Sequence, residues 1–235
     1  EDDDRTLFFA TKKGIVKRCS VRDFSRPLSS GIIAMGFRTE SDYLMDVLLT
    51  EPRQDIAMVT SNGMSIRFAQ SEVRVMGRTA QGVRGVRLRD GDELVRIAAV
   101  EPEIDPDAAD EAAEPADSFL LVVTCNGYGK RTPMSEYRLQ SRDGVGIITI
   151  KTNDRNGEVV GARLVSESDD LLVISSNGYM TRMAVSDIRA IGRNTQGVRI
   201  MSLQENERIQ GIARLPKDED DEVNRQEKAI EAEES

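Results

Sequence analysis

The sequence predicts an all-β protein in which small sheets follow one another as the blades of a propeller-like array. Three observations lead to this fold class. A unit of roughly fifty residues occurs four times, and a repeat of that length is typical of radial or stacked architectures. Each unit begins with an apolar run, a tight turn and a second, alternating run, which is the pattern of a β-hairpin. Almost no segment shows the periodicity of an amphipathic helix.

Each repeat is anchored by one glycine. The repeats span residues 5–52, 53–100, 118–167 and 168–216, and their anchors are Gly14, Gly63, Gly127 and Gly178. An apolar trio precedes each anchor, and asparagine comes directly before three of the four. Asn-Gly between apolar runs predicts a two-residue hairpin turn with positive φ at both central positions. We expect the hydroxyl three residues before each glycine to bond the backbone of the turn, at Thr11, Thr60, Thr124 and Ser175.

The remainder of each repeat predicts two further strands. An acid follows the second strand, at Asp23, Glu72, Glu136 and Asp187, and we interpret these acids as structural. After a polar loop, another glycine opens a third predicted strand, at residues 32–35, 83–88, 147–150 and 198–201. A fourth strand closes the repeat, as at residues 43–49 and 94–100. Four strands in each unit are what a blade array requires.

Charge is distributed unevenly along the chain. The formal net charge is −9, but residues 1–4, an insert at residues 101–117 and a tail at residues 217–235 hold 21 of the 41 acids. The remaining chain has 29 basic and 20 acidic residues, a net charge of +9. The insert and the tail have a composition typical of disorder. A basic folded body predicts a polyanionic partner, and the tail is expected to compete for the same surface.

Several functional classes are excluded by residue inventory. The chain has no histidine, and its two cysteines, Cys19 and Cys125, lie in different repeats without metal-ligand spacing. We therefore expect no metal site, no catalytic residues and no cofactor in this chain. No apolar run reaches the length of a membrane span, so we expect no membrane partner, and two isolated thiols are typical of a protein in a reducing cytoplasm.

The first candidate DNA-binding series lies four residues after each anchor glycine. It consists of Arg18, Arg67, Arg131 and Arg182, with Lys17 and Lys130 adding charge in repeats one and three. Arginine binds phosphate oxygens bidentately, so we interpret the series as phosphate clamps repeated along a curved duplex. The alternative is a strand position kept polar by alternation and paired with the acid five residues later.

The second series lies in the polar loops. Arg78, Arg142 and Arg193 occupy matching loop positions, Arg74, Arg138 and Arg189 form a third set, and Arg22 and Arg84 are less regular. Loops project from a scaffold and often carry function, whereas the alternative is an arginine that caps its own loop. Evenly spaced cations without interleaved aromatics predict phosphate contact with duplex DNA, not stacking on single strands.

Long phrases of the repeats resemble one known family. Residues 76–85 (MGRTAQGVRG), 126–132 (NGYGKRT) and 191–198 (IGRNTQGV) are similar to the C-terminal domain of the DNA gyrase A family, and the resemblance covers residues 5–216. It implies a β-pinwheel whose blades exchange strands, with double-stranded DNA bent around a basic rim. It also implies a parent topoisomerase that uses ATP and Mg²⁺ for negative supercoiling, with gyrase B and a second gyrase A as its partner subunits.

The chain departs from that family pattern in two respects. It shows four repeats, fewer than the family usually has, and it lacks the basic, glycine-rich gyrase box; the nearest string is Arg84–Arg87. Because the chain starts at Glu1, we expect it to be part of a longer protein. Three alternatives stay open: the equivalent C-terminal domain of topoisomerase IV, a protein-binding β-propeller scaffold, and an enzyme with a site in a central channel.

Overall fold

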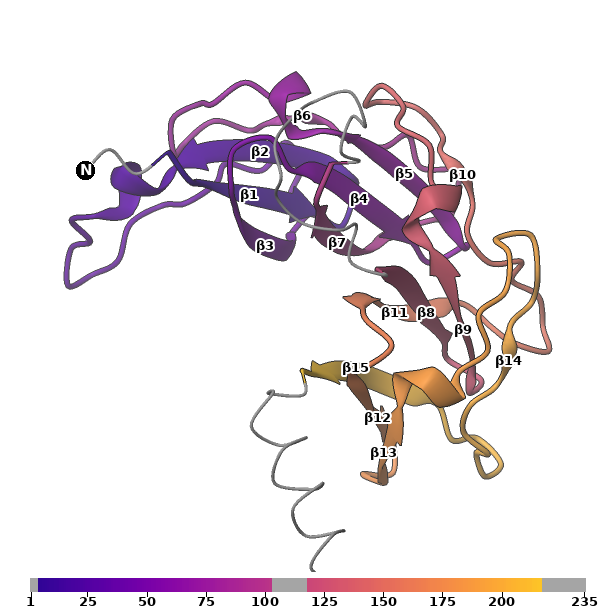
Figure 1. The fold of residues 1–235 in the computed structure, drawn as a ribbon. Helices are drawn as coiled ribbons and strands as arrows, with labels where there is room; N and C mark the ends of the chain where they lie inside the picture. Colours follow the sequence, from indigo (N-terminus) through magenta and orange to yellow (C-terminus); the bar gives the residue numbers. More distant parts are fainter. Residues whose placement is uncertain (1–3, 103–117, 217–235) are drawn as a thin grey trace, which may run out of the picture.

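The computed structural model describes residues 4–102 and 118–216, which form fifteen β-strands and four short 3₁₀ helices. The strands make four antiparallel sheets that follow one another along an arc (Figure 1). The predicted all-β blade array is confirmed. The disorder expected for the acidic insert and for the acidic tail concerns residues 103–117 and 217–235, which lie outside the described residues.

Each blade is built on the predicted hairpin. The four hairpins are β1 (Thr6–Thr11) with β2 (Ile15–Ser20), β4 (Asp55–Thr60) with β5 (Met64–Ala69), β8 (Phe119–Thr124) with β9 (Tyr128–Pro133), and β12 (Asp170–Ser175) with β13 (Met180–Ala184). The turn type differs from the prediction. The anchor glycines have φ between 75° and 82°, but the preceding asparagines do not have positive φ.

The turn is instead a three-residue loop that ends in a left-handed glycine, the second common hairpin connection. The Gly63 N–H donates to the Thr60 carbonyl at 3.0 Å, and the same bond recurs in the other three repeats. Three hydroxyls have the expected local role: Thr11 Oγ1 accepts from Ile15 N at 3.2 Å, Thr60 Oγ1 accepts from Met64 N at 3.3 Å, and Thr124 Oγ1 donates to the Tyr128 carbonyl at 3.2 Å. Ser175 differs from the prediction, because its hydroxyl donates to Glu207 Oε1. Asn-Gly thus places the hairpin correctly, although only the glycine takes the left-handed conformation.

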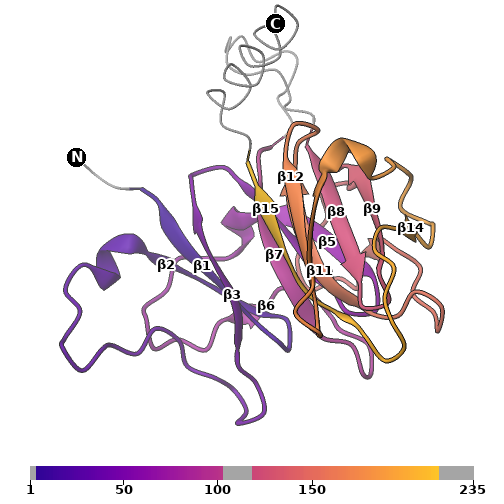
Figure 2. The ribbon, with the colours of Figure 1, turned by 90° about the horizontal axis from the view of Figure 1, so that it is seen from below.

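The inner edge of every blade is the predicted fourth strand. These strands are β3 (Leu44–Thr50), β7 (Leu94–Val100), β11 (Val159–Val165) and β15 (Ile209–Leu215). Each pairs with the first strand of its own hairpin. β7 contacts both β3 and β11, and β11 contacts β15, so these strands line the concave side of the arc (Figure 2).

The outer edge of a blade is contributed by the following repeat. β6 (Val83–Arg84) pairs with β2, β10 (Ile147–Ile148) with β5, and β14 (Val198–Arg199) with β9. This is the strand exchange that the resemblance implies. The predicted third strands are much shorter than expected, because the chain soon turns away from the sheet that receives it.

Two predictions about strands are wrong for the same reason. Residues 32–35 form no strand, and the fourth sheet has three strands in the order β13-β12-β15. In the first three blades, the outermost strand always comes from the next repeat. Among the described residues, no repeat follows β15 and no sheet precedes β1. Residues 32–35 therefore have no edge to join, and β13 has no partner on its outer side.

The core lies between blades. Phe8 from β1 packs with Ile56, Met58 and Phe68 from the second hairpin, and the Phe8 and Phe68 ring centroids are 6.4 Å apart. The alternate residues of the same strand, Ala57 and Val59, face the third blade. Both faces of the central strands are thus buried, which explains why they read as continuous apolar runs without much aromatic content.

Candidate nucleic-acid interface

The convex side of the arc is formed by three stretches that we call the outer-edge segments: residues 73–87, 137–151 and 188–202. Each starts after a 3₁₀ helix, and its first residues run parallel to the second strand of the preceding hairpin, as in the bridge between Arg18 and Val75. The segment then forms a loop and returns antiparallel as β6, β10 or β14. The repeat therefore places the loops that contain the predicted arginines on the outside of successive blades (Figure 1).

The loop arginines are half-buried, and two of them, Arg142 and Arg193, are held in place by acids that we interpreted as structural. The Arg142 N–H donates to Glu72 Oε2 at 3.0 Å, and Arg142 Nη1 donates to the Arg84 carbonyl at 3.0 Å. The Arg193 N–H donates to Glu136 Oε2 at 3.2 Å. An acid in one repeat thus fixes the loop that the next repeat lays over it. Glu136 also offsets part of the charge of Arg193, since its Oε2 lies 3.7 Å from Arg193 Nε.

The third arginine set is fully solvent-facing. Arg74, Arg138 and Arg189 are exposed at the start of the outer-edge segments, and Arg84 is exposed in β6. Asp143 is the single acid within the three segments, 3.4 Å from Arg84 and 3.5 Å from Arg87. The segments therefore present many basic side chains and one acid, interspersed with exposed apolar residues such as Val75 and Leu139, and the excess of positive charge is the arrangement expected for phosphate contact.

The strand series needs a correction, because two of its members are interior side chains. Arg67 is 4% exposed and Arg131 is 6% exposed. Arg67 Nε donates to Asp55 Oδ2 at 2.9 Å and Nη1 to the Tyr137 carbonyl of the next repeat at 3.3 Å. A buried arginine that bonds two repeats is an inter-blade brace, so we remove Arg67 and Arg131 from the proposed contact set.

The surroundings of the four arginines in the strand series depend on the residue at one neighbouring position. The residue twelve places before the arginine is its diagonal neighbour on the first strand of the hairpin. These neighbours are Asp55 for Arg67, Phe119 for Arg131 at 4.5 Å from ring centroid to guanidinium carbon, and Asp170 for Arg182 at 2.6 Å. Arg18 has Thr6 there, and burial lowers the pKa of Arg18. Arg182 is exposed but ion-paired, so only Arg18 keeps an uncompensated charge within the proposed interface.

The two lysines of the series are buried completely, which contradicts their interpretation as phosphate contacts. Lys130 is 0% exposed, and its Nζ donates to the Gly192 and Arg193 carbonyls at 2.7 Å each. Lys17, also 0% exposed, donates to the Ala34 and Arg78 carbonyls. Burial lowers the pKa of Lys130 to about 8, with Glu136 opposing the shift and Arg193 adding to it. Each lysine therefore fixes the backbone of a loop arginine.

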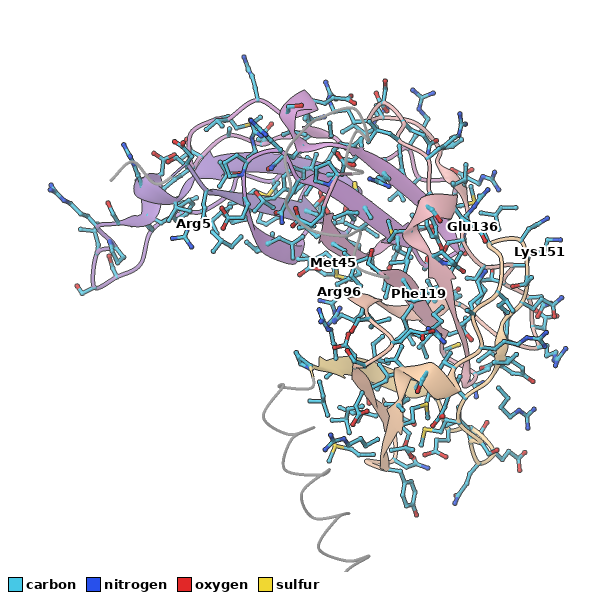
Figure 3. All side chains as sticks on the ribbon, in the orientation of Figure 1. Arg5, Met45, Arg96, Phe119, Glu136 and Lys151 are labelled. Carbon is cyan, nitrogen blue, oxygen red and sulfur yellow. The ribbon has the colours of Figure 1, made fainter. Side chains whose placement is uncertain are left out.

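The outer edge holds basic residues that sequence reasoning missed. Arg87 and Lys151 lie five residues after the glycine that opens the exchanged strand. Lys151 lies on the convex side of the arc and points outward (Figure 3). Arg155 and Arg199 are exposed as well. The shared spacing of Arg87 and Lys151 was a usable signal. Arg22 lies exposed on the 3₁₀ helix at Val21–Phe24, and its contact with DNA stays a prediction.

The described residues contain neither a metal-binding cluster nor a membrane-spanning helix. No group of three His, Cys, Asp or Glu side chains in the described part of the chain is arranged to hold a metal ion. Residues 4–102 and 118–216 contain no helix that is long and apolar enough to cross a membrane. Cys19 is buried, Cys125 is half-buried, and both are free thiols.

Comparison with known proteins gives a consistent result. A family described as the DNA gyrase C-terminal domain, beta-propeller, matches residues 5–51, 54–101, 118–166 and 169–216. The DNA gyrase A protein of Staphylococcus aureus (strain NCTC 8325 / PS 47) is 42% identical over 229 residues, which are 97% of this chain and 24% of that protein. The same protein from strain MRSA252 is also 42% identical, over 94% of this chain and 24% of its own length.

Two solved structures share the fold. A DNA gyrase A C-terminal domain superposes with a TM-score of 0.77 at 25% identity, covering 91% of this chain and 67% of that one. The C-terminal domain of DNA topoisomerase IV superposes with a TM-score of 0.81 at 22% identity, covering 92% and 63%. At that lower identity the second comparison supports the architecture alone.

Proposed function

Because the chain belongs to the family of DNA gyrase A C-terminal domains, we propose that it binds duplex DNA without sequence preference and wraps the duplex along its outer-edge segments. The observation that carries the proposal is the placement of the loop arginines. Arg78, Arg142 and Arg193 come from equivalent positions of successive repeats, and the loops that contain them lie outside successive blades along one convex arc (Figure 1). A partner that contacts all three must itself be long, curved and regularly charged.

The chemistry of these segments favours backbone contact over base reading. Guanidinium groups match phosphate oxygens in geometry, and the described outer-edge segments contain no α-helix to enter a major groove. Affinity would then come from phosphate neutralisation, and sequence would act through the bendability of the duplex. Wrapping without base contacts around a basic protein rim is physically feasible, as in the nucleosome.

The role of the longer protein is proposed on family grounds. The chain spans about a quarter of the length of the curated relatives that it matches. We propose that it serves a topoisomerase in which wrapping supports ATP-dependent negative supercoiling in the cytoplasm, at the nucleoid. ATP, Mg²⁺, gyrase B and a second gyrase A would be bound by regions other than this chain.

A salt titration tests the proposal. Binding of the 235-residue chain to a labelled duplex of mixed sequence should weaken steeply, by about a thousandfold or more between about 50 and 200 mM salt if six or more phosphates are neutralised. Ligating nicked circular DNA in the presence of the chain should shift the linking number if the duplex is wrapped. Salt-insensitive binding, or binding without a topological shift, would contradict wrapping.

The rivals predict different outcomes. Exposed apolar side chains occur on β3 (Leu44, Val47 and Leu49), around the start of β13 (Tyr179 and Met180) and on the outer-edge segments (Val75, Leu139, Val145 and Ile148). A protein-binding scaffold would use such surfaces and show little salt dependence. A topoisomerase IV C-terminal domain would bind DNA with similar salt dependence. The identity to gyrase A relatives over 97% of the chain favours gyrase over that alternative.

A further inference from the structure

Two arginines from different repeats meet on a single phenol at the outer side of the third blade. Tyr128 opens β9, and Arg199 of β14 is its register partner in the exchanged strand pair. Arg199 Nη2 donates to Tyr128 Oη at 3.0 Å, and Arg155 Nε donates to the same oxygen at 3.2 Å. The guanidinium carbons lie 5.4 Å (Arg199) and 5.0 Å (Arg155) from the ring centroid. Both arginines therefore share one neutral acceptor and one aromatic ring.

The two positive charges are not compensated by the residues around them. Among the described residues, neither Arg155 nor Arg199 forms an ion pair with a carboxylate. Other arginines of the blades do, including Arg67 with Asp55 and Arg182 with Asp170. Two like charges held against one phenol repel each other, and an anion placed between them would relieve that repulsion. The lowered pKa of Tyr128, caused by hydrogen bonds from Arg199 and then Arg155, agrees with a strongly positive surrounding.

The loop that carries Arg155 is fixed to the outer-edge segment that carries Arg199. Lys151 N donates to the Thr195 carbonyl at 2.8 Å. Asn156, which is 0% exposed, donates through Nδ2 to the Lys151 carbonyl at 2.8 Å and to the Gln196 carbonyl at 3.0 Å. These bonds hold the Arg155 loop and the Arg199 segment together before any ligand arrives. A site arranged in advance loses less conformational entropy on binding.

We propose that Arg155 and Arg199 form a clamp for one phosphodiester group of duplex DNA, with the Tyr128 hydroxyl holding the two guanidinium groups side by side. The clamp rests on the proposed function and adds a defined contact to it. Each arginine donates one N–H to the phenol. Because both arginines are exposed, the remaining N–H donors of the two guanidinium groups can bind phosphate oxygens. Since Arg155 comes from repeat three and Arg199 from repeat four, the phosphate would also join two repeats.

A double-mutant cycle on the 235-residue chain tests the clamp. R155A and R199A should each reduce the slope of log K against log salt by about 1, because one phosphate contact is lost. The R155A/R199A variant should lose no more than either single variant, because both side chains act on the same phosphate. R53A is the matched control: Arg53 is an exposed arginine in the turn between β3 and β4, at the opposite end of its blade from the hairpin turn. It should leave the slope unchanged.

Y128F separates positioning from charge. The phenylalanine keeps a ring under both guanidinium groups and removes only the shared acceptor. Y128F should weaken duplex binding. The coupling energy between R155A and R199A should also be smaller in the Y128F background than in the parent. Thermal unfolding of R155A and R199A should match the parent, since both arginines are exposed. Y128F changes a side chain that is 4% exposed, so its binding is measured at a temperature where its thermal unfolding curve shows it to be folded.

The possible failures can be told apart. Slopes that fall by about 2 in the double variant would mean two independent phosphate contacts and would overturn the clamp. Unchanged binding by R155A and R199A, while R78A and R193A weaken it, would also overturn the clamp and leave the proposed function standing. If none of these four variants changes the salt slope, the proposed function itself fails.

Discussion

Replacing Arg67 with methionine tests whether this buried series holds the blades together or contacts DNA. The Arg67 guanidinium bonds Asp55 within its own blade and the Tyr137 carbonyl of the next repeat. R67M leaves the Asp55 carboxylate, 4% exposed, without its arginine. Breaking a buried ion pair by removing one partner costs about 3–5 kcal/mol. For a domain of this size, about 2–4 °C per kcal/mol gives a Tm lowered by about 6–20 °C.

Duplex binding by R67M, in contrast to its stability, should be unchanged. Because Arg67 faces the neighbouring blade, the salt slope of duplex binding should be the same for R67M and for the parent at a temperature where both are folded. R193A is the matched comparison: its arginine is half-buried in an outer loop. It should reduce the slope by about 1 and change the free energy of unfolding by only about 0.5 kcal/mol.

A paired replacement checks that the cost arises from the stranded carboxylate. The D55L/R67M variant removes both charges, and apolar replacement of a buried pair is often neutral, so the Tm should recover most of the loss. Calorimetry or circular dichroism measures the Tm, and fluorescence anisotropy measures binding. If R67M keeps the parent Tm and lowers the salt slope, the brace is wrong and the original interpretation as a phosphate clamp is right.

Three further predictions concern the lysine brace, the hairpin glycines and the tail. Because the pKa of Lys130 is lowered to about 8, the amide shift of Gly192 should titrate near pH 8 by NMR and lose that titration in K130I. Since this pKa lies below that of an unfolded lysine, the stability of the parent relative to K130I should rise between pH 8 and 10.5. G63A should destabilise more than G178A in thermal unfolding: both glycines are left-handed, but a Cβ at Gly63 would lie 2.1 Å from a neighbouring carbonyl and one at Gly178 meets nothing within 4 Å. Deleting the chain from Lys217 onward should tighten duplex binding at low salt, and unchanged affinity would argue against competition by the tail.

Local features of the fold were predictable because they depend on neighbours in sequence. The hairpins at Gly14, Gly63, Gly127 and Gly178 follow from a left-handed residue between apolar runs, a requirement that few residues other than glycine meet. The destination of Val83–Arg84 was not predictable in this way. A short strand carries no local information on whether it completes its own sheet or an adjacent one, and here β6 joins the sheet of the preceding repeat.

The residues of the candidate site were also predictable only where their surroundings depend on neighbours in sequence. Loop position identified Arg78, Arg142 and Arg193 because polar loops lie at surfaces. Strand alternation placed Arg67 on a polar position, but it could not show that the next blade covers that face. The available signal was Asp55, twelve residues earlier, since a carboxylate that lies across a hairpin from an arginine marks a pair. Arg155 and Arg199 lie 44 residues apart in sequence and meet only through strand exchange.

Exchange of the outer strands has a mechanical consequence. If a duplex wraps along the outer-edge segments as proposed, its bending stiffness exerts an outward force on the loops of those segments. Each of these loops ends in a short strand that pairs with the sheet of the previous repeat. This force on a loop is therefore opposed at both ends of the loop, by the sheet that accepts the short strand and by the hairpin that precedes the loop. Separating one blade from the others would first require breaking the strand pairing that it shares with the adjacent blade. The force from the bent duplex would therefore be distributed over several repeats.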